Sequence, residues 1–286
     1  MRTLKNVFAW VVLATCSLAM SAPASKSVFV RVMTYNIRCG SCEKPSDVNH
    51  WSKRKFLVAD VIRQSGADLI GLQEAELFQV KDLVALLSDF DWVGVGRDDG
   101  KEQGEMNAVL VRRAAWSIES QTTLWLSDTP DKVSRGWDAA LNRTVTALTL
   151  KNRQGGQRLR LLNTHFDHLG VRARVESAKL IVKNVQALGE TDPVILTGDF
   201  NDRPGSDPYR VLGGALDDAA LASRNAAQGG NVTFNNFGRE IEPGNKIDYV
   251  FVSRGQEVRS HRIITDLREG RYPSDHFPIV VEIGLH

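Results

Sequence analysis

The sequence predicts a mixed α/β domain in which β-sheets pack on one another. Short apolar runs of strand length recur along most of the chain, and segments with helical spacing lie between them. Some of these strands are joined as hairpins, which favours packed sheets with interspersed helices. No internal repeat and no Pro/Ser-rich linker interrupts the 286 residues, so we expect one domain. Its 42% hydrophobic and 24% charged side chains are typical of a globular protein.

Helices are expected where apolar residues recur every three or four positions. In the first of them Phe56, Leu57, Val61 and Ile62 form such a stripe. The expected helices cover residues 51–64, 77–87, 172–188 and 208–212.

Strands are expected where apolar residues alternate or run without interruption over a few positions. In chain order these are residues 28–35, 67–72, 92–95, 107–112, 118–126, 144–150, 158–164, 193–197, 246–253, 258–264 and 279–283. Residues 226–245, rich in Gly and Asn, are expected to form a surface loop.

The first 24 residues have the order of a secretory signal peptide. Arg2 and Lys5 precede the apolar residues 7–13, and residues 17–24 are rich in small side chains. The apolar run is too short to span a bilayer, which takes ~20 residues. We expect cleavage after Ala22 or Ala24 and an exported domain over 25–286, periplasmic or secreted, without stable membrane insertion. A lipoprotein box ending at residue 16 is the alternative.

The charge of the remaining chain is balanced. Of 36 Lys and Arg, two lie in the first 24 residues, which contain no acid, so 34 face the 34 Asp and Glu of residues 25–286. A protein that holds nucleic acid or an anionic membrane by bulk charge needs a basic excess. This class of function is therefore disfavoured.

Two cysteines remain after cleavage, Cys39 and Cys42, in a polar loop. A thioredoxin-like redox pair should open a helix in a βαβ unit, and this pair does not. A local disulfide or two free thiols is the better interpretation.

Polar residues collect where the expected strands end. In α/β sheets, such ends are where sites are assembled from distant segments. The six groups are Asn36, Gln73-Glu74, residues 163–167, residues 199–201, Asp248 and residues 274–276.

If the acids of these segments converge, their mutual repulsion requires a cation or an imidazolium among them. The available donors are oxygens, two histidines and amides, which suit Mg²⁺ or Mn²⁺ better than Zn²⁺. Mg²⁺ commonly joins carboxylates to phosphate oxygens. The set therefore predicts metal-assisted phosphate chemistry.

These six segments, in this order, resemble the endonuclease/exonuclease/phosphatase superfamily with its DNase I-like fold. The resemblance runs from about residue 28 to residue 283, and residues 104–146 look like a bacterial exported branch. It implies a four-layer α/β sandwich, with two packed mixed β-sheets flanked by helices. It also implies hydrolysis of a phosphate ester by an in-line water.

The resemblance implies roles for the acids and amides. Glu74 would be the main metal ligand, Asn36 would lie next to it, and Asp275 would complete or support a metal position. Asp199 would orient or deprotonate the water, and Asn201 would hold it or a phosphate oxygen.

It also implies that His165 and His276 contact the scissile phosphate. Asp248 would fix His276 and Glu105 would fix His165, and each carboxylate would raise the pKa of its imidazole. Arg143 is expected at the substrate, because related enzymes often place a phosphate-binding residue at this position. Asp167 is expected there too, because it lies two residues after His165 and, on an extended chain, would point the same way.

The substrate stays open. A phosphodiester or a phosphomonoester, as in sugar phosphates, nucleotides or lipid head groups, fits the motifs, and we expect a monomer. A nuclease is the alternative. Its basic candidates are Arg38, Lys53, Arg54, Lys55, Arg172, Arg174 and Lys246. A redox protein and a silent binding module are less favoured.

Overall fold

The computed structural model describes residues 28–187, 189 and 191–285. The expected signal peptide at 1–24 lies outside the described residues, so cleavage and export stay predictions. Within the described part of the chain, no helix combines the length and the apolarity that crossing a membrane would require.

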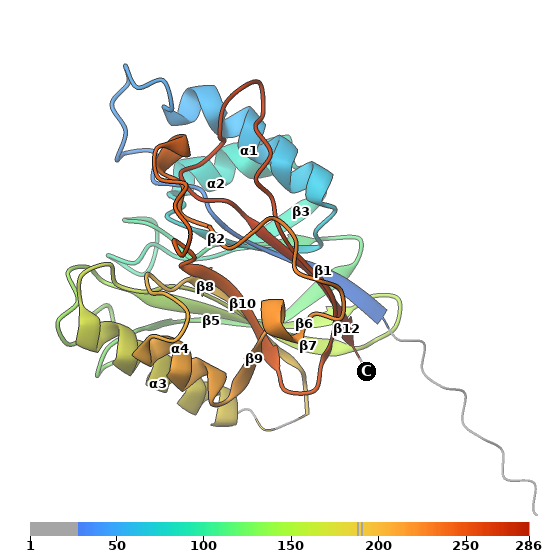
Figure 1. Ribbon diagram of the computed structural model, residues 1–286. Coiled ribbons are helices and arrows are strands. Elements are labelled where there is room, and N and C mark those ends of the chain that lie inside the picture. The colour runs from blue at the N-terminus through green and yellow to red at the C-terminus, as the bar shows by residue number, and fades with distance from the viewer. Residues whose placement is uncertain (1–27, 188, 190, 286) are drawn as a thin grey trace, which may run out of the picture.

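Two six-stranded sheets pack face to face, and helices cover their outer sides (Figure 1). The first sheet has the order β11 (Glu257–Ile263), β12 (Ile279–Leu285), β1 (Val28–Asn36), β2 (Leu69–Gln73), β4 (Val109–Arg112), β3 (Phe90–Val93). The second has the order β5 (Trp116–Trp125), β6 (Thr144–Asn152), β7 (Arg158–His165), β8 (Val194–Asp199), β10 (Asp248–Ser253), β9 (Leu216–Asp218).

The helices are α1 (Trp51–Ser65), α2 (Leu77–Leu86), α3 (Val171–Ala187), α4 (Asp207–Gly213) and α5 (Ala219–Ala222), with a 3₁₀ turn η1 (Asn236–Gly238). In Figure 1, α1 and α2 cover the first sheet, and α3 and α4 cover the second. Each sheet contains parallel and antiparallel pairs. The expected four-layer sandwich with two mixed sheets is therefore confirmed.

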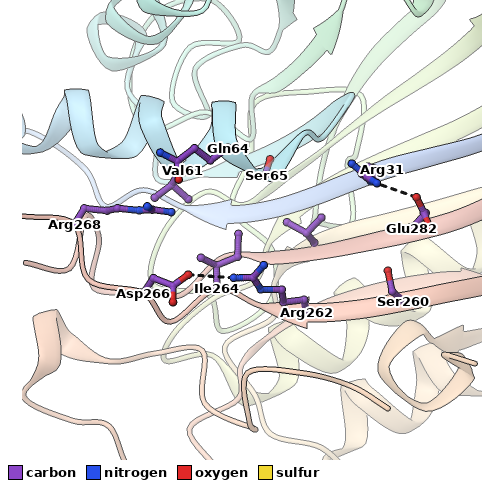
Figure 2. Close-up of a pocket in the computed structure, with 11 residues that line it drawn as sticks. Arg31, Val61, Gln64, Ser65, Ser260, Arg262, Ile264, Asp266, Arg268 and Glu282 are labelled. Carbon is purple, nitrogen blue, oxygen red and sulfur yellow. Dashed lines mark hydrogen bonds and ion pairs between the residues drawn. The ribbon is translucent and has the colours of Figure 1, made fainter. Parts of the chain in front are cut away.

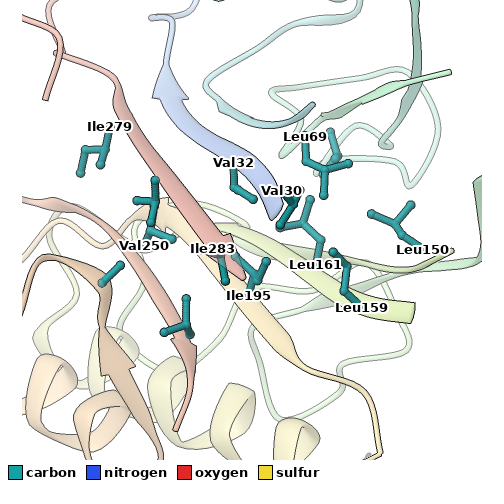
Figure 3. Packing of buried hydrophobic residues seen from close by; sticks show 14 of the residues in the cluster. Val30, Val32, Leu69, Leu150, Leu159, Leu161, Ile195, Val250, Ile279 and Ile283 are labelled. Carbon is teal, nitrogen blue, oxygen red and sulfur yellow. The ribbon is translucent and has the colours of Figure 1, made fainter. Parts of the chain in front are cut away.

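Apolar side chains fill the three spaces between the layers. Val30 and Val32 of β1 point toward the second sheet and meet Leu161 and Ile195 there (Figure 3). Met33, the next residue of β1, points the other way and joins the core under α1 and α2. Because successive side chains of a strand face opposite sides, a strand buried on both faces reads as an almost continuous apolar run.

The space between the sheets also holds one polar bridge. Asn163, fully buried on β7, donates to the backbone oxygens of Leu72 and Ala108 (2.8 and 3.0 Å) and accepts from Gln73 and Thr197 (2.6 and 3.0 Å). Asn163 therefore joins the two sheets and does not point toward the candidate site. Gly71 lies against this bridge, where a Cβ atom would collide with the side chains of Thr197 and Asn163.

Candidate active site

Strand directions bring the predicted segments to one edge of both sheets. β1 and β2 are parallel, so Asn36 and Glu74 follow neighbouring strand ends. β12 runs antiparallel to β1, with Ile279 opposite Thr34, so the residues just before β12 reach the same edge. In the second sheet β7 and β8 end together, and Asp248 at the start of β10 is opposite Asp199.

Glu74 and Asp199 are held together by a neutral amide. Nδ2 of the buried Asn36 donates to Glu74 Oε1 and to Asp199 Oδ2, both at 2.9 Å. The amide oxygen of Asn36 accepts the N–H of Arg38 at 3.0 Å. Burial, and then the charge of Asp248, raise the pKa of Asp199 to about 7.

His276 is fixed by Asp248. His276 Nδ1 lies 2.9 Å from Asp248 Oδ2, and Nε2 lies 3.8 Å from Asp199 Oδ2. Burial alone would lower the pKa of His276, but the carboxylates of Asp248 and Asp199 raise it to about 10. His276 is therefore an imidazolium at neutral pH, as expected from the sequence.

His165 behaves differently from expectation. Asn201 Nδ2 donates to the backbone oxygen of Phe166 and lies 3.0 Å from His165 Nε2, which assigns the acceptor role to Nε2 and the proton to Nδ1. Burial, followed by the charges of Arg143 and Arg97, lowers the pKa of His165 well below its usual value. The expected raised pKa is wrong, and His165 is neutral.

Glu105 explains the difference. Its Oε2 lies 4.0 Å from His165 Nδ1 but 2.6 Å from the guanidinium of Arg97. Burial and the neighbouring charge of Glu74 raise the pKa of Glu105 to about 7. Glu105 thus lies beside His165, as predicted, but its carboxylate forms an ion pair with Arg97. The sequence did not single out Arg97.

Asp167 does not point toward a substrate. Its carboxylate accepts the backbone N–H groups of Ala140, Leu141, Leu169 and Gly170 and the Arg143 Nε–H at 3.3 Å. These donors lower its pKa. The chain leaves the extended conformation after His165, so the expected substrate role of Asp167 is wrong: it holds a loop and Arg143. The second guanidinium nitrogen of the buried Arg143 contacts His168 at 3.0 Å.

Asp275 does not belong to any group of described His, Cys, Asp and Glu residues whose ligand atoms lie close enough together to hold a metal ion. Its Oδ2 pairs with Arg38 at 2.7 Å, and its Oδ1 lies 3.3 Å from Ser274 Oγ. The expected ligand role of Asp275 is therefore not supported, since its charge is already paired with an arginine.

A divalent cation fits the donors on the Glu74 side. Ligand atoms of Glu74, His165 and Asp199 lie within 4.8 Å of one another, and so do those of Asp199, Asp248 and His276. In the second group the imidazolium of His276 balances the acids. In the first, Glu74 and Asp199 share a neutral amide and a neutral imidazole, so a cation bound there would lower the cost of ionising both carboxylates.

A separate hollow lies on the outer face of the first sheet, beside α1 (Figure 2). Its arginines Arg31 and Arg262 pair with Glu282 and Asp266 at 3.2 and 3.1 Å. None of the six predicted strand-end segments lines this hollow. This hollow is therefore separate from the candidate site at the strand ends.

A family profile described as the endonuclease/exonuclease/phosphatase family matches residues 33–276, which include every predicted site residue. The chain belongs to this family. Membership confirms the expected class of enzyme, a phosphoric ester hydrolase.

Solved structures with this fold include two from Bacteroides thetaiotaomicron. A family member of that species is 35% identical, with a TM-score of 0.86, over 91% of this chain and 99% of the other. A mannosyl-6-phosphatase of the same species is 36% identical, with a TM-score of 0.83, over 89% and 99%. Among curated proteins, nocturnin of Drosophila melanogaster is 24% identical over 87% of this chain and 44% of its own length.

Proposed function

We propose that the protein is a divalent-metal-dependent phosphoesterase that acts on small phosphomonoesters, with sugar phosphates as the first candidates. The observation that carries the proposal is the pair Glu74 and Asp199, whose carboxylates share one neutral amide beside the His276 imidazolium. This arrangement combines a cation-binding position, a proton acceptor and a permanent positive donor in one place.

Mg²⁺ or Mn²⁺ held by Glu74, with Asn36 beside it, would supply positive charge to the phosphate. Asp199, with its raised pKa, would accept the proton of the attacking water. His276 would donate Nε2–H to a phosphoryl oxygen and stabilise the charge that develops on it. Neutral His165 and Asn201 would orient the same group, and Arg143 would add a charged donor.

The basic side chains near the site favour a small substrate over nucleic acid. Five of the seven nuclease candidates are engaged with acids of the same chain: Arg38 with Asp275, Arg54 with Glu43, Lys55 with Asp82, Arg174 with Asp202 and Lys246 with Asp218. A paired cation releases few counterions when it meets a phosphate backbone. The 36% identity to a mannosyl-6-phosphatase supports sugar phosphates as the first class to test.

A substrate panel with Mg²⁺ tests the proposal. It contains mannose 6-phosphate, glucose 6-phosphate, a nucleoside monophosphate, bis-p-nitrophenyl phosphate, single-stranded DNA and RNA. We expect release of inorganic phosphate from a sugar phosphate, loss of this release in His276→Ala, and wild-type rates in the control Asp128→Ala, whose side chain is exposed. Cleavage of DNA or RNA without phosphomonoesterase activity would support the nuclease alternative instead.

We also propose export of residues 25–286 as a periplasmic or secreted monomer. The order of charge, apolarity and small residues in 1–24 supports the export. N-terminal sequencing of protein from the periplasm and the medium tests it, and an intact Met1 on cytosolic protein would contradict it.

A further inference from the structure

The loop that contains the two cysteines is docked on the segment that carries Glu74. Three successive backbone N–H groups, those of Cys39, Gly40 and Ser41, donate to Glu74 Oε2 (3.1 Å), Gln79 Oε1 (3.0 Å) and Glu76 Oε2 (2.7 Å). Glu74 and Glu76 lie in the connection between β2 and α2, and Gln79 lies in the first turn of α2. The loop therefore fixes the polar side chains of that connection.

Both oxygens of the Glu74 carboxylate are thereby oriented. Oε1 accepts Asn36 Nδ2 at 2.9 Å, and Oε2 accepts the Cys39 N–H at 3.1 Å. The backbone of Glu74 has a φ of 59°, a left-handed conformation that a side chain other than Gly adopts at a cost. The carboxylate thus depends on its neighbours to stay in this position.

The cysteine loop is closed covalently. Cys39 and Cys42 form a disulfide with a Cα–Cα distance of 5.3 Å. Cys39 is buried, whereas Cys42 is exposed, so a dithiol can reach the bond from solvent. Opening the ring restores backbone freedom to residues 39–42, and the Cys39 N–H is then no longer aimed at Glu74 by a closed loop.

We propose that the Cys39–Cys42 disulfide is a positioning element for Glu74, so that its oxidation state sets the affinity of the enzyme for its divalent cation. The inference rests on the proposed function only in taking Glu74 as a metal ligand. Groups that hydrogen-bond to a metal ligand typically change affinity by about 10- to 100-fold when they are lost. Turnover at saturating metal should change far less, because among the described residues no hydrogen bond or ion pair joins Asp199 or His276 to residues 39–42.

The chemical change is a two-electron reduction. A dithiol attacks the sulfur of Cys42, the exposed residue of the pair, the S–S bond breaks, and a second thiolate of the same reagent resolves the mixed disulfide. The products are the Cys39 and Cys42 thiols and the cyclic disulfide of the reagent. Oxidation reverses the change.

Manganese binding measures the effect without any substrate. Mn²⁺ is titrated into metal-free wild-type protein, untreated or reduced with a dithiol that is then removed under nitrogen, and into the double variant Cys39→Ser/Cys42→Ser. Free Mn²⁺ is followed by electron paramagnetic resonance. We expect Kd to rise about 10-fold or more in the reduced protein and in the double variant.

Three controls make the result decisive. Exposure to the dithiol must leave Kd of the double variant unchanged, and reoxidation must restore Kd of the wild type. Circular dichroism verifies that each protein is folded at the titration temperature. A Kd that is equal in the oxidised, reduced and double-variant proteins would overturn the inference, even if phosphatase activity is present. A redox-dependent Kd without phosphatase activity would support the inference and contradict the proposed function.

Discussion

His276 Nδ1 lies 2.9 Å from Asp248 Oδ2, and both side chains are almost fully buried at the edge where the two sheets meet. The two residues come from the start of β10 and the segment before β12, which belong to different sheets. This contact keeps a positive charge in the site over the whole physiological pH range.

Asp248→Asn should move the alkaline limb of the pH profile. Without the carboxylate, the pKa of His276 falls from about 10 toward or below the ordinary 6.5, so the imidazolium is lost near neutral pH. We expect kcat/KM at pH 8 to fall about 10²-fold, with a smaller loss at pH 6. Initial rates of phosphate release across this range measure it. If the alkaline limb of the kcat/KM profile has the same midpoint in Asp248→Asn as in the wild type, Asp248 does not set the pKa of His276.

The stability of the metal-free protein should fall as pH rises from about 5 to 8. The folded-state pKa of Asp199 is raised from 3.8 to about 7, so stability is lost as the pH rises between these values. His276, raised from 6.5 to about 10, gives stability that is complete below 6.5 and is lost toward 10, which has the same sign.

Mg²⁺ should reverse part of this loss, because it binds the ionised carboxylates. The rise in Tm on adding Mg²⁺ is therefore expected to be larger at pH 8 than at pH 5, and smaller in Asp199→Asn than in the wild type at pH 8. Differential scanning calorimetry at both pH values measures it. An equal rise at the two pH values would argue against these carboxylates as the cation site.

Asp167→Ala should destabilise the fold by about 3 kcal/mol, because it leaves backbone N–H groups of a partly buried loop and the buried Arg143 guanidinium without their acceptor. Urea unfolding measures the free energy, and Asp128→Ala, at an exposed position, is the matched control. Folding lowers the pKa of Asp167, so the wild type gains stability as the pH rises from strongly acid values and this carboxyl ionises. The difference in the free energy of unfolding between the wild type and Asp167→Ala should therefore increase over the same pH range. A change below 0.5 kcal/mol at neutral pH, on the scale of ordinary surface substitutions, would mean that the carboxylate is not structural.

Gly71→Ala should destabilise the protein by about 1–3 kcal/mol through overpacking, because the added methyl group would displace Asn163 and Thr197 between the sheets. Gly213→Ala on α4 is the control, since its Cβ would meet nothing within 4 Å. We expect that variant to be neutral or slightly stabilised. Equal stabilities of the two variants would show that the sheets can move apart at Gly71.

The site residues that could be predicted are those attached directly to strands. Glu74, His165, Asp199 and Asp248 each end, follow or begin a strand, so strand direction alone brings them together. Arg97 and the Cys39 N–H act from loops, whose paths depend on contacts with distant segments and leave no periodic pattern. The prediction for Asp167 was wrong because it extended the strand conformation two residues past His165, where β7 ends.

The long elements of the fold could be predicted from the sequence, but the shortest could not. The long strands and helices lie within a few residues of their expected bounds, because their apolar positions are periodic. β9 and α5 were not predicted, since three and four residues are too few to show a period. The disulfide was one of two interpretations that stayed open, because the spacing of two cysteines does not give the path of the loop between them.

The most direct test of the account is phosphate release from a sugar phosphate during a Mg²⁺ titration of chelator-treated enzyme, with Glu74→Ala beside the wild type. The account predicts no release in excess chelator, saturable recovery with Mg²⁺ in the wild type, and no recovery in Glu74→Ala over the same range. Full activity of the wild type in excess chelator, or equal Mg²⁺ activation of Glu74→Ala, would contradict it.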